Sequence, residues 1–301
     1  MQPSSPLPPP ISAILFALAG VGFLSLMDAF MKEAALVAGA YTATLLRSAA
    51  ATAFIGPVWA LRRPKWPSWP VMKLHLERGI ISAFMALSFF YALTKLPLAE
   101  AIALSFIAPL LALYLARILL GEEIKRAAIL ASILGFIGTL IIVGGRIGDG
   151  AFDEDAALGL AAMAFSALLY AYNFIVIRRQ SQIAGPIEIA TFHSGIGGLV
   201  MLVFAPLLWA TPPVTIASDI AAAGLLTVLG AMAIAWAYAR AEAQTLVPIE
   251  YSGFLWASLF GWLFFKEGVT VTTLIGTALI VSGCLIAART SREQKQPVEQ
   301  V

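Results

Sequence analysis

Asp28 and Arg47 are charged residues that stand inside long apolar stretches of this 301-residue sequence. A charge at membrane depth is costly unless it is paired or hydrated, so such a residue is a candidate for function. The two positions fall at similar predicted depth. We therefore predict that Asp28 and Arg47 pair as an outer gate that breaks when the protein changes conformation. A fixed structural ion pair is the alternative.

Aromatic, amide and hydroxyl side chains gather near the middle of several apolar stretches. An apolar pocket with a few polar groups suits a neutral or aromatic amino acid or a similar metabolite. Side chains of the same kinds also face lipid or pack between helices, so the sequence does not fix which of them line a cavity. The candidates for a substrate cavity are Phe84, Ser88, Tyr91, Tyr170, Tyr172, Asn173, Trp236, Tyr251 and Trp256.

Pro109 and Gly253 are candidate hinges. Pro109 lies near the middle of an apolar stretch, where a proline removes a backbone hydrogen bond and kinks a helix. Gly253 lies at the matching place of a second, related stretch, where glycine gives the backbone freedom without a kink. A moving hinge and a static bend that improves packing are both compatible with these residues.

The same residues exclude most other chemistry. Asp, Glu, Lys and Arg are absent from the expected middle of each stretch, which predicts a facilitator without dedicated ion coupling. The sequence lacks a GxxxxGK[ST] phosphate loop, and its single cysteine, Cys284, lies in an apolar run. We therefore predict no catalytic residue, no metal site and no cofactor, and we do not expect an enzyme.

Long apolar helices must position these residues. The chain is 60% hydrophobic and only 12% charged, and about 20 apolar residues are enough to cross a bilayer core of roughly 30 Å. The sequence predicts an all-α integral membrane protein with ten transmembrane helices. The predicted spans are residues 11–31, 40–61, 71–93, 98–119, 125–143, 158–177, 186–210, 216–239, 247–265 and 269–288.

The spans fall into two related halves. Glu122 matches Glu267 and Asp28 matches Asn173 at a step of 145 residues, and Arg47 matches His193 one residue further on. Because five spans is an odd number, the second half must enter the membrane from the opposite side, which makes the repeat inverted. His193 is then expected near the inner face. The two glutamates each precede a helix, whose N-terminus a carboxylate stabilises.

The distribution of basic residues sets the orientation. Thirteen lysines and arginines fall in segments on one side and four on the other, which predicts cytoplasmic N- and C-termini. The predicted domains follow from the halves. They are a Pro-rich cytoplasmic N-terminus (1–10), a first repeat (11–145), an acidic outer loop (146–157), a second repeat (158–288) and a cytoplasmic tail (289–301).

Two further groups are interpreted as structural. His75, Glu77 and Arg78 open the third span and are expected to anchor it at the interface. Small residues such as Gly276 and Gly283 let helices approach closely, and we expect them to serve packing within each half, with dimerisation as the alternative.

The chain resembles the EamA family of the drug/metabolite transporter superfamily. The resemblance covers nearly the whole chain and is carried by the two five-span halves, Leu120-Gly121-Glu122 after the fourth span, Ala108-Pro109 within it, and Arg47 early in the second span. The second half departs from this pattern, with Phe254 in the place of Pro109. Within the family the chain is most similar to exporters of aromatic amino acids.

This resemblance implies export of small amphipathic metabolites through a cavity between the halves, by alternating access, in a cell inner membrane. Neutral or aromatic amino acids are the leading substrates, and the direction of transport rests on the resemblance alone. The alternatives are a drug or metabolite permease that imports or uses protons and, outside transport, a membrane enzyme or signalling scaffold. The expected partners are a small-molecule substrate and the lipid bilayer, without nucleic acid, for a monomer or a homodimer.

Overall fold

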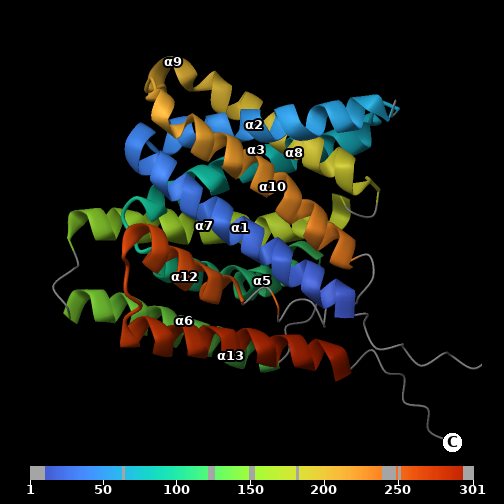
Figure 1. The fold of residues 1–301 in the computed structure, drawn as a ribbon. Helices are drawn as coiled ribbons and strands as arrows, with labels where there is room; N and C mark the ends of the chain where they lie inside the picture. Colours follow the sequence, from blue (N-terminus) through green and yellow to red (C-terminus); the bar gives the residue numbers. More distant parts are fainter. Residues whose placement is uncertain are drawn as a thin grey trace, which may run out of the picture.

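The computed structural model of the chain is an all-helical bundle (Figure 1). It describes residues 11–62, 65–120, 126–148, 153–180, 183–238, 249 and 252–293, and no strand occurs in these ranges. Its elements are α1 (Ile11–Ala38), α2 (Ala40–Leu61), α3 (Trp69–Leu93), α4 (Leu98–Ser105), α5 (Ala108–Leu120), α6 (Arg126–Gly148), α7 (Glu154–Gln180), α8 (Pro186–Val203), α9 (Ala205–Leu208), the 3₁₀ turn η1 (Val214–Ile216), α10 (Ala217–Tyr238), α12 (Gly253–Phe265) and α13 (Val271–Glu293).

Several of these helices have the length and composition of membrane spans. Within the described residues, six helical segments are long and apolar enough to cross a membrane, in α1, α2, α3, α7, α8 and at η1–α10. Shorter apolar segments lie in α6, α12 and α13. Large apolar side chains also cover much of the surface, for example Leu199 (63% exposed) and Leu255 (69%). Surface of this kind requires lipid, so the chain is a multi-pass membrane protein.

The helix bounds follow the spacing of the predicted repeat. Both ends of α12 lie 145 residues after those of α5 (253 − 108 = 145; 265 − 120 = 145). The starts of α6 and α13 differ by the same step (271 − 126 = 145), and those of α2 and α8 by one residue more (186 − 40 = 146). In these three pairs the counterpart helices therefore begin at equivalent residues, whereas the starts of α1 and α7 (154 − 11 = 143) and of α3 and α10 (217 − 69 = 148) are offset by two or three residues.

The packing of the helices has the same regularity. α1 packs against α10 and α12, and its counterpart α7 packs against their counterparts α3 and α5. Likewise α2 packs against α10, and its counterpart α8 packs against α3, the counterpart of α10. Two further contacts, α2 with α8 and α6 with α13, each join a helix to its own counterpart. Figure 1 shows α1 and α7 running in opposite directions. The bundle is thus arranged about an approximate two-fold axis that passes between α2 and α8 and between α6 and α13.

Glycine allows the closest of these contacts, between α6 and α13, which lie side by side (Figure 1). A Cβ atom on Gly138 would lie 2.5 Å from the carbonyl oxygen of Gly276, and one on Gly276 would lie 2.5 Å from the carbonyl oxygen of Gly138. No side chain fits at either place. Because α6 and α13 belong to different halves, the expectation of packing within each half is wrong for Gly276.

The first helix is longer than predicted, because a charged residue near its end is buried. Lys32 is 4% exposed within α1, its ammonium pairs with Glu267, and it donates a hydrogen bond to the carbonyl of Leu96 (2.9 Å). With its charge matched, Lys32 does not end the helix, which continues to Ala38. Asp28 therefore lies almost three turns from the end of α1, at about 3.6 residues a turn, and not one turn as the sequence suggested.

The predicted fourth span is broken at the turn Phe106–Ile107, just before Pro109. Pro109 has no N–H group to offer to the carbonyl four residues before it. The amides of Phe106 and Ile107 instead bond three residues back, to Ala103 and Leu104, at 3.2 Å each. The bend that the proline predicts is therefore present.

The second half begins a helix at the matching place without a proline. α12 begins at Gly253, the counterpart of Ala108, and the amide of Ser252 bonds the carbonyl of Ile249 (2.9 Å), three residues back, as the amide of Ile107 bonds Leu104. Helices therefore begin at equivalent residues in both halves, although Phe254 replaces Pro109 in the second half.

Candidate functional site

Ionic contacts and an aromatic cluster mark the two ends of the bundle. The first end, which we call the Lys32 end, holds the Lys32–Glu267 pair and an exposed pair between Lys95 and Asp155 (2.7 Å). The hydrogen bond and charge of Asp155 raise the pKa of Lys95, but an exposed pair of this kind adds little stability. The predicted outer segments meet at this end.

The opposite end, which we call the His75 end, is packed with rings. Phe192 lies edge-on to Trp59 and Trp66, with ring centroids 5.3 and 5.6 Å away, and stacks on His75 at 4.6 Å. His75 also contacts the carboxylate of Glu188 (3.0 Å). These contacts hold α2, α3 and α8 together at the His75 end.

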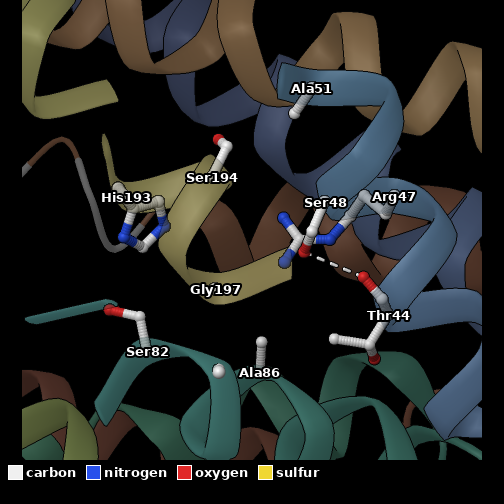
Figure 2. A pocket seen from close by; sticks show the side chains of 10 residues that line it. Thr44, Arg47, Ser48, Ala51, Ser82, Ala86, His193, Ser194 and Gly197 are labelled. Atoms are coloured by element: carbon white, nitrogen blue, oxygen red, sulfur yellow. Dashed lines mark hydrogen bonds between the residues drawn. The ribbon is translucent and has the colours of Figure 1, made fainter. Parts of the chain in front are cut away.

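A small cavity lies between α2, α3 and α8 (Figure 2). Its volume of about 10 Å³ is room for about one water molecule. Figure 2 shows Arg47 from α2 and His193 from α8 facing the cavity from opposite sides, with α3 below them. Its lining is Thr44, Arg47, Ser48, Ala51, Ser82, Ala83, Ala86, His193, Ser194 and Gly197.

This central cavity lies on the approximate two-fold axis. Arg47 and His193 are repeat counterparts (193 − 47 = 146), and Ser194 is the counterpart of Ser48 at the same step. Arg47 lies seven residues into α2 and His193 seven residues into α8, about 10 Å from opposite ends of the bundle. The structure thus places His193 across the cavity from Arg47, and its expected depth near the inner face stays a prediction.

Arg47 has spare hydrogen-bonding capacity. Its Nη1 donates one long bond to Thr227 (3.4 Å), its guanidinium lies over the ring of Phe90 (5.2 Å to the centroid), and its Nε is buried without a hydrogen-bond partner. Asp28 is close enough for the two charges to attract each other, yet no direct ion pair joins them. The predicted pair is therefore not formed in this conformation, and its role as a gate stays a prediction.

A chain of side-chain hydrogen bonds leads from the central cavity toward the His75 end. Ser82, in the cavity lining, donates to Oδ1 of Asn173 (3.4 Å). Arg78 donates to the same oxygen from Nε (3.3 Å) and to Gln180 from Nη1 (3.0 Å). Gln180 in turn bonds Nδ1 of His75 (2.6 Å). The chain ties α3 to α7 and ends at the His75–Glu188 contact with α8.

The interpretation of His75 and Arg78 as interfacial anchors is therefore wrong. They are 1% and 9% exposed, and their partners come from other helices. The sequence carried a signal that the interpretation overlooked, because residues 75, 78 and 82 follow the spacing of one helix face. A polar stripe on an otherwise apolar span indicates a face turned toward protein and away from lipid.

A second, larger cavity lies at the Lys32 end, with a volume of about 460 Å³, within the size range of small-molecule sites. The predicted candidates Ser88 and Tyr91 lie in its lining, next to Tyr41 and Thr42 at the start of α2. Its remaining lining is Ala38, Gly39, Ala40, Leu87, Ala162, Leu208 and Ala210. The larger of these two cavities thus lies at the Lys32 end.

The other predicted lining residues do not border either cavity. Phe84 lies edge-on to Phe204, Tyr172 donates to Glu77 (2.6 Å), Trp236 stacks on Phe16, Trp256 stacks on Phe260, Asn173 binds Arg78, and Tyr170 lies within electrostatic reach of Arg78. Tyr251 lies outside the described residues. A substrate role for these residues stays a prediction for another conformation.

Gly253 gives a clean test of the hinge. A Cβ atom there would lie 3.5 Å from Cγ1 of Val21, an ordinary contact, so alanine fits. We expect Gly253→Ala to leave stability unchanged or to raise it by up to about 1 kcal/mol, because alanine restricts the unfolded chain. If the backbone flexes here during transport, the rate in proteoliposomes falls several-fold. Gly56→Ala in α2, where a Cβ atom would be 4.0 Å from Thr52, is the matched control. An unchanged rate in Gly253→Ala indicates a static bend.

Comparison with known proteins assigns the chain to a family. The sequence profile of the EamA-like transporter family matches residues 11–144 and 157–289. The chain is similar to the pseudopaline exporter CntI of Pseudomonas aeruginosa, with 28% identity over 290 residues that cover 93% of this chain and 97% of CntI. It is also similar to the aromatic amino acid exporter YddG of Ancylobacter novellus, with 27% identity over 154 residues, 50% of each protein.

One protein of known crystal structure has the same fold, with a TM-score of 0.64 and 21% identity over 95% of this chain and 99% of that one. The family profile matches the chain twice, once in each of the two repeated halves. The resemblance noted from the sequence is therefore confirmed, and the chain belongs to the EamA-like transporter family.

Proposed function

We propose that the protein is a carrier that exports small amphipathic metabolites across a cell inner membrane by alternating access, with neutral or aromatic amino acids as the leading substrates. The observation that carries this proposal is the position of the central cavity on the axis that relates the halves. Inverted repeats place the substrate site there, because exchange of the two halves opens the same site to either side. Arg47 and His193, one from each half, border it.

The mechanism follows from the same geometry. In the proposed topology ten spans form two inverted repeats, at 11–145 and 158–288, with both termini in the cytoplasm. The Lys32 end then faces outward, and the described conformation, wide at the Lys32 end and packed at the His75 end, is the outward-open one. Rearrangement at the breaks before Pro109 and at Gly253 would close the outer cavity while the aromatic cluster at the His75 end separates.

Substrate class and direction rest on two kinds of support. The large cavity combines apolar walls with the hydroxyls of Tyr41, Ser88 and Tyr91, of which those of Tyr41 and Ser88 donate to backbone carbonyls and can still accept a hydrogen bond from an amphipathic solute. The relatives CntI and YddG both carry the name exporter, which favours export, but they differ in substrate, so the amino-acid assignment rests on the cavity and the resemblance. We propose a facilitator driven by the gradient of its substrate.

One observation favours a second candidate, a proton-coupled permease of the same family. Asp28 lies well inside α1 and within electrostatic reach of Arg47, so a titratable carboxyl stands near the proposed path. An acid at such a place can take up a proton when Arg47 binds another anion. An imposed pH gradient across proteoliposomes separates the two candidates, since only the coupled carrier accumulates substrate against its gradient.

The test of the proposed function is counterflow into proteoliposomes with a panel of labelled amino acids. Ser88→Phe adds an aromatic ring to the lining of the large cavity and is expected to reduce exchange at least tenfold. The same aromatic placed on the lipid-facing surface by Leu199→Phe, at a residue 63% exposed, is the control and is expected to keep full activity. Absence of exchange for every solute in the panel, with correctly folded protein, contradicts the proposed substrate class.

A further inference from the structure

We propose that the central cavity is the subsite for the carboxylate of the substrate, and that Arg47 binds it. The inference rests on the proposed function and names the chemical group that this carrier recognises. Its basis is an imbalance of donors and acceptors around Arg47, a lack of acid in the cavity lining, and the alignment of the central cavity with the larger one.

Arg47 has more hydrogen-bond donors than the structure provides with acceptors. A guanidinium carries five N–H donors in a planar fork that matches a carboxylate. The structure gives Arg47 one long hydrogen bond, to Thr227 at 3.4 Å, and leaves Nε buried and unpaired. An arginine held in this way gains most from an anion that arrives with two oxygens.

The other polar groups of the cavity do not supply that anion. None of the ten lining residues is acidic. Ser48 donates its hydroxyl to the carbonyl of Thr44 (2.9 Å), and Ser82 donates to Asn173. Nδ1 of His193, on the opposite wall, is buried without a hydrogen-bond partner. Two side chains on facing walls of the cavity, Arg47 and His193, therefore each hold a buried nitrogen atom without a hydrogen-bond partner.

Two arginines and one acid act electrostatically on the polar groups of the cavity lining. Arg47 and Arg78 both act electrostatically on His193, and Asp28 is the acid within reach of Arg47. Because Asp28 forms no direct ion pair with Arg47, it neutralises the charge at a distance and leaves the fork free. A substrate carboxylate then competes with Asp28 for Arg47, and it has the advantage of direct contact.

The two cavities together fit an amphipathic acid. Arg47 lies six residues after Tyr41 on α2, and Ser82 lies six residues before Ser88 on α3, so both helices pass from the large cavity to the central one over about 9 Å. A solute of that length places its apolar body between Tyr41 and Ser88 and its carboxylate at Arg47. The central cavity has room for about one water molecule, so the carboxylate enters as α2 and α8 separate.

The experiment compares an acid with its amide in the intact protein. Counterflow of labelled L-phenylalanine and L-phenylalaninamide is measured in proteoliposomes, together with the amino-acid panel. The wild type is expected to exchange the acid and at most one tenth as much of the amide. Arg47→Gln is expected to lose at least tenfold in exchange of the acid, and Arg47→Lys to keep an intermediate rate, because an ammonium supplies charge without the fork.

Controls separate this role from a structural one. Arg179→Gln removes an exposed arginine of α7 and is expected to leave exchange unchanged. Asp28→Asn removes the competing charge and is expected to lower the concentration of acid needed for half-maximal exchange. Thermal unfolding of each variant in detergent checks that it is folded. If Arg47→Gln fails to fold, Arg47→Lys and the acid–amide comparison in the wild type carry the test.

The outcomes are distinct. Equal exchange of acid and amide by the wild type, or full exchange of the acid by folded Arg47→Gln, overturns the carboxylate subsite and leaves the carrier function standing. Lack of exchange of every solute in the panel overturns the proposed substrate class, and the subsite with it. Discrimination against the amide that disappears in Arg47→Gln supports both.

Discussion

Valine in place of Gly138 or Gly276 is expected to leave little folded protein in the membrane. A Cβ atom at either position would lie 2.5 Å from a backbone carbonyl oxygen of the facing helix, and close to Ile280 or Ile142 as well. Backbone cannot rotate away as a side chain can, so α6 and α13 must separate along their contact. Overpacking of a well-packed core costs about 1–3 kcal/mol, and a contact between two backbones belongs at the upper end of that range.

The same helix provides the control. A Cβ atom on Gly144, six residues after Gly138 in α6, would meet no atom within 4 Å, so Gly144→Val is expected to behave like the wild type. Thermal unfolding in detergent and the elution profile of the tagged protein measure the difference. Equal stability of Gly138→Val and Gly144→Val would show that the close approach of α6 and α13 contributes nothing to folding.

Glu267→Gln is the other substitution with a large expected effect on stability. One oxygen of Glu267 pairs with the buried ammonium of Lys32, and the other accepts the amide of Leu98 at the start of α4 (2.7 Å). The carboxylate therefore stabilises the N-terminus of α4, and not that of α13, the helix that it precedes in the sequence. The neutral amide leaves the Lys32 ammonium with the carbonyl of Leu96 but without its carboxylate. Removal of one partner of a buried pair costs about 3–5 kcal/mol.

Substitution of Lys32 and substitution of Glu267 are expected to destabilise the protein to different extents. The side chain of Lys32 is 5% exposed and that of Glu267 22% exposed, so Glu267 tolerates loss of its partner better. Lys32→Met is therefore milder than Glu267→Gln, and the double variant is more stable than Glu267→Gln alone. A double-mutant cycle on unfolding temperature measures the coupling. Strictly additive effects would mean that Lys32 and Glu267 stabilise the fold independently.

The sequence predicted the repeat in detail because duplication keeps the spacing of turns. The step between Glu122 and Glu267 is the step between the starts of α5 and α12 and of α6 and α13. Proline chemistry also predicted the break before Pro109. Arg47 and His193 were recognised as counterparts, but their meeting in one cavity required the three-dimensional axis, which a pairwise alignment of residues does not contain.

The sequence did not predict which helix faces pack inside the bundle and which face lipid. Apolar residues cover both, so hydropathy does not assign Trp236 to a helix contact or Tyr91 to a cavity. Contacts between the halves, such as Lys32 with Glu267, join residues more than two hundred positions apart and leave no local pattern. The buried stripe of His75, Arg78 and Ser82 was visible in the spacing, but the position of these residues near the start of a span suggested the interface instead.

The first half carries Arg47 where the second half carries His193, and this difference has a further consequence. A carrier with identical halves would have inward- and outward-facing states of equal energy. Here α2 brings a permanent charge to the axis, while α8 brings a group that can be neutral, so the mirror-image states are not equivalent. In the proposed alternating-access cycle, this difference is one source of unequal energy between the two orientations of the empty protein, and exchanging the arginine with the histidine is expected to shift their balance.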